Sequence, residues 1–182
     1  MVRRAVSATA LIATLVALTG CDGDRRDWST AQFAPSLEPS WGVRETDGRL
    51  QIWTGSPCVG ITQISLSHNM GGPKLVLKPI RPEGAAVEYL TLGGPYPGLA
   101  VAESWPDGLD WRSADQLVLQ VDGKDVHFGS TTQVSDITAG SPGHPQDTYW
   151  FDGVGWMSPA DVAAQDGKTF TAVCTPDPLP KS

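Results

Sequence analysis

The chain has 182 residues, 20 of them acidic and 13 basic, and a formal net charge of −7. This length suits a single domain with a sizeable core. Lysine and arginine form no cluster that could neutralise phosphates, which argues against nucleic-acid binding, and the negative balance disfavours electrostatic docking onto anionic lipid.

Residues 1–20 have the order of a secretory signal peptide. Arg3 and Arg4 precede an uncharged, mostly apolar run over residues 5–18. Its last residue begins the tetrad Leu18-Thr19-Gly20-Cys21. The run would form roughly 21 Å of helix, too short for a bilayer core of about 30 Å, so a membrane span is disfavoured. A plain secretory signal that happens to end in cysteine is one interpretation of this segment.

The tetrad Leu18-Thr19-Gly20-Cys21 resembles the lipobox of bacterial lipoproteins. The resemblance implies cleavage by signal peptidase II before Cys21, a diacylglyceryl group on its thiol and fatty acyl chains such as palmitate. The protein would then be anchored by lipid at the extracytoplasmic face of the cell membrane. In a Gram-negative host, Asp22 after the lipidated cysteine would resemble the inner-membrane retention signal of lipoprotein sorting.

The composition, rich in Ala, Gly, Pro and Trp with only five lysines, fits a high-GC genome. Residues 53–58, Trp-Thr-Gly-Ser-Pro-Cys, form an expected strand, turn and cysteine. They resemble a segment of uncharacterised envelope proteins of high-GC Gram-positive bacteria, and this short resemblance implies no function.

The expected organisation has four parts. Residues 1–20 form a lipoprotein signal peptide, and 21–40 form a lipidated N-terminus and a flexible tether that is charged and interrupted by prolines. Residues 41–174 form a single β-rich extracytoplasmic domain, and 175–182 form a Pro-rich tail.

Two Asp-Gly dipeptides predict β-hairpins with two-residue turns. Asp47-Gly48 places Val43 opposite Ile52. Asp122-Gly123 places Leu119 opposite Val126 and Leu117 opposite Phe128, with His127 on the outer face.

The remaining turn signals predict further strands and one helix. Ser158 as N-cap, Pro159 and Asp161 start a short helix that ends near Gly167. The predicted strands are 59–67, 74–80, 86–92, 99–104 and, after the helix, 168–174. The fold class is therefore mainly β, an antiparallel sandwich or barrel-like domain with one short helix near the C-terminus.

The cysteines follow from the expected location. If Cys21 carries lipid, Cys58 and Cys174 remain as one pair in an oxidising compartment, and we expect them to form a disulfide. Two free buried thiols are the alternative.

The polar residues give no strong catalytic or metal-binding signal. His68, His127 and His144 lack a nearby nucleophile motif or zinc spacing, and the last two are expected at the surface. The tetrads at 107–110 and 122–125 read Asp-Gly-x-Asp and could hold calcium, but Asp-Gly is also what a tight turn selects. We expect no metal site, no cofactor and no catalytic residues.

Aromatic residues are the candidate binding surface. They gather in two segments and can stack on sugars, grip a peptide or lie in lipid, or else fill the core. The candidates are Trp105, Trp111, Tyr149, Trp150 and Trp156. Along a strand, Trp150 should face opposite to Tyr149 and Phe151.

The sequence therefore predicts a lipid-anchored, non-enzymatic envelope protein that binds an unknown envelope protein or small ligand. One alternative is a carrier of a lipid or small apolar molecule. This would require the inner faces of two sheets to part and the Gly-Pro loops to form a mouth. The second alternative is a hydrolase whose residues the sequence does not identify.

Overall fold

The computed structural model describes residues 37–176 and 178. The expected signal peptide, Cys21 and most of the expected tether lie outside these residues. Across the described positions, no helix has the length and apolar character that crossing a bilayer would require.

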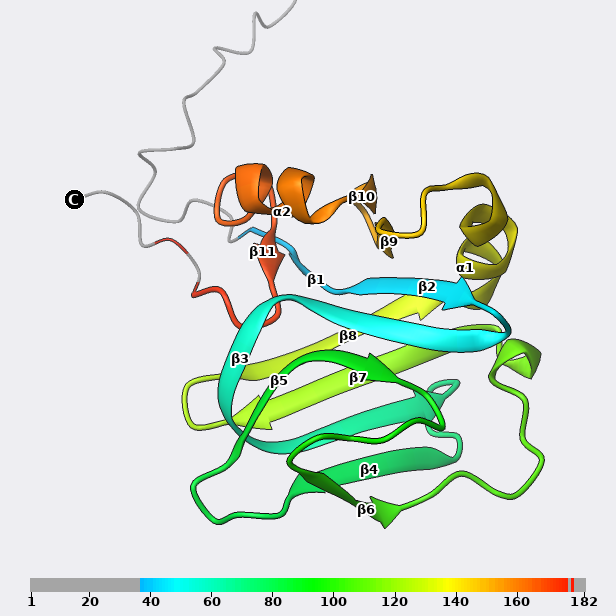
Figure 1. Cartoon of the computed structure of the whole chain (residues 1–182), viewed down its shortest axis with the longest axis vertical. Coiled ribbons are helices and arrows are strands. Elements are labelled where there is room, and N and C mark those ends of the chain that lie inside the picture. Colours follow the sequence, from blue (N-terminus) through cyan, green and yellow to red (C-terminus); the bar gives the residue numbers. More distant parts are fainter. Residues whose placement is uncertain (1–36, 177, 179–182) are drawn as a thin grey trace, which may run out of the picture. The chain divides into compact units, whose positions relative to one another are not determined.

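The described chain is mainly β and antiparallel, as the sequence predicts, and no closed barrel is found (Figure 1). The α-helices are α1 (Val134–Gly140) and α2 (Pro159–Gln165), and short 3-10 helices cover Trp111–Ser113 and Ser141–Gly143. The strands are β1 (Pro39–Ser40), β2 (Gly42–Thr46), β3 (Arg49–His68), β4 (Lys74–Pro79), β5 (Ala85–Thr91), β6 (Leu99–Glu103), β7 (Gln116–Gly123), β8 (His127–Gln133), β9 (Tyr149–Phe151), β10 (Gly155–Met157) and β11 (Thr171–Ala172).

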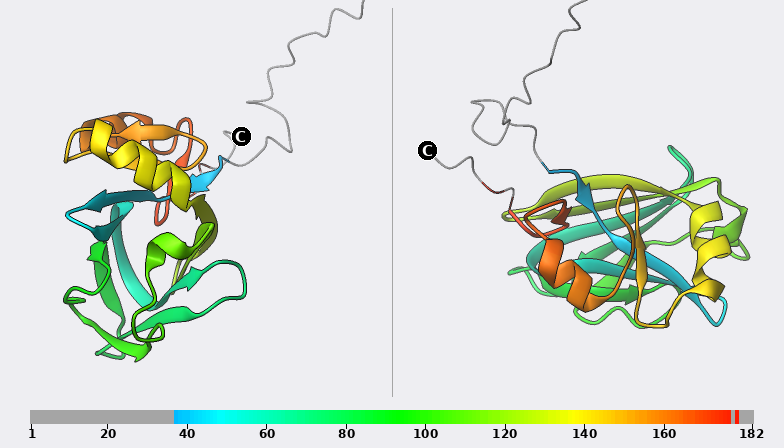
Figure 2. Two further views of the ribbon diagram at one scale, coloured as in Figure 1. Left: turned by 90° about the vertical axis from the view of Figure 1, so that its right-hand side faces the viewer. Right: turned by 90° about the horizontal axis from the view of Figure 1, so that it is seen from above.

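Strand β3 is 20 residues long and is shared by the two halves of one bent sheet. Its first part pairs with β2 and β5, and its last part pairs with β4 and β7. These strands form one nine-stranded sheet that bends along β3. We call its two halves the first sheet, with the order β10-β9-β2-β3-β5, and the second sheet, with the order β6-β4-β3-β7-β8. The two sheets fold over each other with β3 as their common strand (Figures 1 and 2).

Segment 53–58 is a bulged stretch of β3 rather than the predicted turn. Register shifts occur between Trp53 and Cys58 and again before Ile61. Gly55 and Gly60 have φ values of 80° and 67°, which a residue with a side chain rarely adopts. Bulges of this kind bend and twist a strand, and they allow β3 to pass from one sheet to the other.

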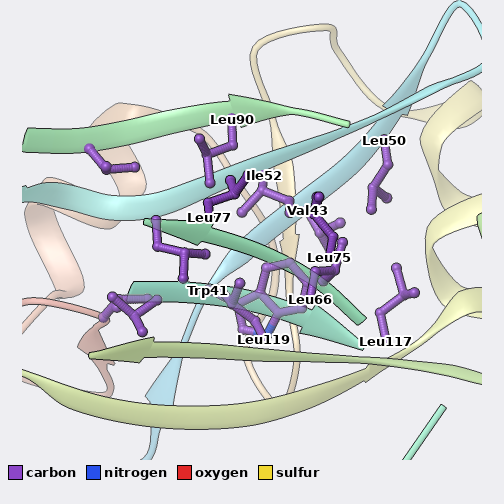
Figure 3. Close-up of a cluster of buried hydrophobic side chains, with 14 of the residues drawn as sticks. Trp41, Val43, Leu50, Ile52, Leu66, Leu75, Leu77, Leu90, Leu117 and Leu119 are labelled. Atoms are coloured by element: carbon purple, nitrogen blue, oxygen red, sulfur yellow. The ribbon is translucent and has the colours of Figure 1, made fainter. Parts of the chain in front are cut away.

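The inner faces of the sheets enclose the main core (Figure 3). Leu50, Ile52 and Leu90 from the first sheet meet Leu66, Leu77 and Leu119 from the second. A second cluster lies on the outer face of the first sheet, where Val162 of α2 covers Trp53, Phe151, Met157 and Phe170.

The first predicted hairpin is confirmed. Asp47 and Gly48 have φ values of 49° and 78°, both positive as a type I′ turn requires, and Val43 pairs with Ile52.

The register predicted for the second hairpin is wrong. Phe128 pairs with Val121, not Leu117, and Leu119 pairs with Ser130. Gly123 continues β7 because it pairs with Ile61 of β3, and its N–H donates to the carbonyl of Val126. The shift is an even number of residues, so the predicted faces survive and His127 is exposed.

The predicted C-terminal helix is confirmed, but the strand after it is shorter than predicted and a second helix precedes it. Ser158 and Asp161 form a capping box at the start of α2, and this hydrogen bonding lowers the pKa of Asp161. The predicted strand 168–174 shortens to β11, which pairs in parallel with β1. The last residues of the expected tether, Pro39 and Ser40, thus lie in a strand. Helix α1 was not predicted, since no side chain caps its N-terminus.

The predicted disulfide is confirmed between Cys58 and Cys174, whose Cα atoms are 5.3 Å apart. It ties the bend of β3 to the segment after β11 across a sequence separation of 116.

We expect the double variant Cys58→Ala/Cys174→Ala to lose about 4–5 kcal/mol of unfolding free energy, because the bond restricts a long loop in the unfolded chain. Urea unfolding followed by tryptophan fluorescence measures this loss. Reducing agent should destabilise the parent protein similarly and leave the double variant unchanged. A loss below about 1 kcal/mol would contradict the assignment of this cross-link as a main stabiliser.

Candidate functional site

The five candidate aromatic residues do not form one surface. Trp111 is only 5% exposed and belongs to the main core, so its inclusion in a binding surface is wrong. The 3-10 helix that carries it is capped by the side chain of Asp110. Arg112 lies over the Trp111 ring at 4.9 Å and also forms a 2.6 Å ion pair with Glu45. The long-range packing of this turn buries a side chain that the sequence left undecided.

Trp150 and Trp156 face each other across the β9–β10 hairpin. Trp150 packs against the main core, while Trp156 stacks on His144 with 4.3 Å between ring centres. A Cβ atom on Gly140 of α1 would lie 2.6 Å from Trp156, so the ring fits closely over this glycine. Both tryptophans are half-buried and mainly attach α1 and the following loop to the first sheet.

Tyr149 points to the opposite side, as predicted from strand alternation. It joins the second cluster beside Trp53, with 5.3 Å between ring centres, and burial raises the pKa of Tyr149. Tyr89 stacks on Trp53 and is 48% exposed.

Trp105 is the candidate that lines a hollow. It borders an apolar groove of about 360 Å³, which we call the mouth groove. The groove is lined by Leu75, Leu92, Gly93, Gly94, Tyr96, Val101, Ser104, Trp105 and Leu109.

The topology explains why this groove exists. Ile61 of β3 pairs with β5 on one side and with β7 on the other. Strand β4 pairs with β3 on the side opposite β7. Strands β5 and β4 therefore lie on the same side of β3. Strand β6 extends the second sheet beyond β4. Residues 92–98 connect β5 to β6 across the space between the sheet edges (Figure 1). Val101 is 50% exposed here, although its pairing partner Leu77 is buried.

Hydrogen bonds hold the groove walls. The Tyr96 hydroxyl accepts a 3.0 Å bond from the N–H of Gly93, and Leu99 donates to the Tyr96 carbonyl. The Trp105 indole N–H donates to the Leu66 carbonyl at 3.0 Å. Hydrogen bonds within the protein therefore fix the positions of Tyr96 and Trp105 before any ligand binds.

Behind the groove, the main core is nearly filled. Tyr96, Leu92 and Leu75 also border a cavity between the sheets, whose volume is about 10 Å³. This is about the space of one water-sized probe. The inner faces interdigitate, so an apolar occupant would lie outside this layer.

The polar groups show little catalytic organisation. His68 Nε2 lies 3.0 Å from Ser113 Oγ, but that hydroxyl donates to the Asp110 carbonyl at 2.6 Å. The hydroxyl is thus used to close a turn instead of donating to the imidazole. His127 lies 2.6 Å from Asp122 on an exposed face.

Asp152 interacts electrostatically with two other acidic residues. Burial raises the pKa of Asp152, and repulsion from Asp136 and Glu38 raises it further. Among the residues that the structure covers, no three His, Cys, Asp or Glu side chains gather in a way that could hold a metal ion.

Of the groove residues, the aromatic pattern of the sequence predicted Trp105, whereas Tyr96, Val101, Leu92 and Leu109 were not predicted. One signal was present: residues 93–98 read Gly-Gly-Pro-Tyr-Pro-Gly, an aromatic residue between prolines in a loop joining two predicted strands. The exposure of Val101 had no local signal, because it depends on which strand lies opposite.

No known protein family matches this chain, and comparisons with curated proteins and solved structures found no match.

We expect Trp111→Ala to lower the unfolding free energy by about 3–5 kcal/mol, because it removes a large buried side chain. Trp105→Ala should lose less, about 1–2 kcal/mol, because Trp105 is half-buried at the groove. Urea unfolding followed by circular dichroism measures both. A larger loss for Trp105 than for Trp111 would show that Trp105 is mainly a core residue.

Proposed function

We propose that this protein is a non-enzymatic binding module at the extracytoplasmic face of the cell membrane, anchored by lipid on Cys21. Its folded domain takes up an apolar group of a partner in the mouth groove. The observation that carries this proposal is the preformed groove of about 360 Å³ with no charged side chain in its lining. Ligand pockets are typically hollows of this size with aromatic and aliphatic walls.

The carrier alternative has less support. A lipid enclosed between the sheets would need a space much larger than the cavity of about 10 Å³ beside Tyr96. The Gly-Pro loop does line the groove, but on the outside of the interdigitated core. The hydrolase alternative has no specific observation in its favour.

The groove is tested with Val101→Asp. We expect this charge to weaken binding of the neutral dye Nile red by about tenfold or more, because burying a carboxylate against apolar walls is unfavourable. Nile red fluorescence titrated with protein measures the affinity.

Val59→Asp is the matched control, since Val59 is 74% exposed on β3 and does not line the groove. Its affinity for Nile red should equal that of the parent. Equal affinities for parent and Val101→Asp would contradict dye uptake by the groove.

The anchor is tested with Cys21→Ala in the native host. We expect the variant to lose its acyl group, because the thiol that receives it is absent, and to shift from the membrane pellet to the soluble fraction. Fractionation and mass spectrometry measure both properties. Thr19→Ala, which keeps a small residue before Gly20, should behave like the parent. An acylated, fully membrane-bound Cys21→Ala protein would refute the anchor.

A further inference from the structure

We propose that the partner of the mouth groove is an extended peptide segment, which adds as a strand to the free edge of β6 and sets alternate apolar side chains into the groove. This inference rests on the proposed function, because it specifies the occupant of the same groove. It follows from the pairing of β6, the direction of its main-chain groups and the position of Val101.

Strand β6 is an edge strand. In the described part of the chain it pairs with β4 alone. Its residues 99–102 read Leu-Ala-Val-Ala, and the first charge is Glu103. Proteins usually protect sheet edges with lysine, proline, a bulge or a cover, because an uncharged edge offers hydrogen-bonding groups to another strand. Positions 100–103 of β6 are exposed, and the register with β4 shifts between Val101 and Glu103, so the regular part of this edge ends at Val101.

The main-chain groups of Val101 point toward the free edge. Ile80 donates its N–H to the Gly98 carbonyl, and the same register pairs Lys78 with Ala100 and Leu77 with Val101. Hydrogen-bonded and non-hydrogen-bonded pairs alternate in an antiparallel ladder. Ala100 therefore bonds to β4, while the N–H and C=O of Val101 face away from it. Leu99 faces the same way, but its N–H already donates to the Tyr96 carbonyl, so Val101 carries the first free N–H of this edge.

The side chain of Val101 connects this edge to the groove. Directly opposed side chains on neighbouring strands lie about 4.5–5.5 Å apart, so a strand added at this edge places one of its side chains beside Val101. Its alternate side chains then meet the apolar lining that includes Tyr96 and Trp105. Strand addition uses these two elements together: main-chain bonds along an edge and pockets for alternate side chains.

A peptide fits this site better than a lipid or a second copy. A lipid chain has no groups to pair with the N–H and C=O of Val101. Two copies of the chain would each carry a formal net charge of −7, and the repulsion between them opposes self-association. A neutral peptide with alternate apolar residues meets neither difficulty.

The test uses the full chain and a capped peptide in which valine and threonine alternate. The control peptide has the same side chains, but two adjacent central amides are N-methylated to block both of its edges. Fluorescence anisotropy measures affinity, and amide exchange by NMR reports on Val101. We expect the parent peptide to bind at least tenfold more tightly than the control and to slow exchange of the Val101 amide at least tenfold.

Val101→Pro provides a second readout from the protein side. Proline is tolerated on edge strands where its missing N–H would face solvent, and it keeps an apolar side chain. This variant should lose the peptide, because the N–H that would bond to it is absent. If it does not fold, the comparison of the two peptides still decides the matter.

The other outcomes separate the two proposals. Equal binding of both peptides with unchanged exchange of the Val101 amide would overturn strand addition. Absence of peptide binding, while Nile red binding is still weakened by Val101→Asp, would overturn it too. In both cases the proposed function would stand. A dimer that Val101→Pro abolishes would overturn the peptide in favour of a second copy. Failure of the peptides together with Nile red binding that ignores Val101→Asp would overturn both proposals.

Discussion

The fold depends on one strand that serves two sheets. Because β3 pairs with β2 and β5 before its bend and with β4 and β7 after it, the path of this one strand sets how the two sheets lie against each other. The bend needs Gly55, where an added Cβ would lie 2.8 Å from the Cβ of Ala172. The disulfide at Cys58 then joins this bend to the last packed segment. The same region thus sets the angle between the sheets and attaches the C-terminal part of the domain.

The bend also explains why one side of the sandwich is closed and another open. Helix α1 contributes Val134 and Ile137 to the main core, and the β9–β10 hairpin packs on its Gly140. On the opposite side of β3, the connection 92–98 spans from β5 to β6, and Trp105 lies beside it at the groove. Tyr96 on this connection, together with Leu75 and Leu92, lies between the core cavity and the groove. The mouth groove is therefore a consequence of the topology rather than of a local motif.

The sequence predicted features that depend on neighbouring residues and failed where residues distant in the sequence interact. The Asp47-Gly48 turn and the capping box of Ser158 depend on neighbouring residues, and both were predicted correctly. The register after Asp122-Gly123 was wrong because a distant strand, β3, pairs with Gly123 and extends β7 past the expected turn. Trp111 was misassigned for the same reason, since only tertiary packing decides whether a loop tryptophan is buried. Residue type alone does not report the strand order that leaves Val101 exposed.

The rigidity of the groove bears on how it can act. Tyr96 and Trp105 are each held by a hydrogen bond to the main chain, so an occupant does not have to order them. Binding to a positioned site avoids much of the entropy lost when flexible side chains are fixed. The edge of β6 is equally positioned, because Ala100 and its neighbours are paired to β4. Because the site is already ordered, only the partner loses conformational entropy on binding. The site therefore favours a segment that is already extended before it binds.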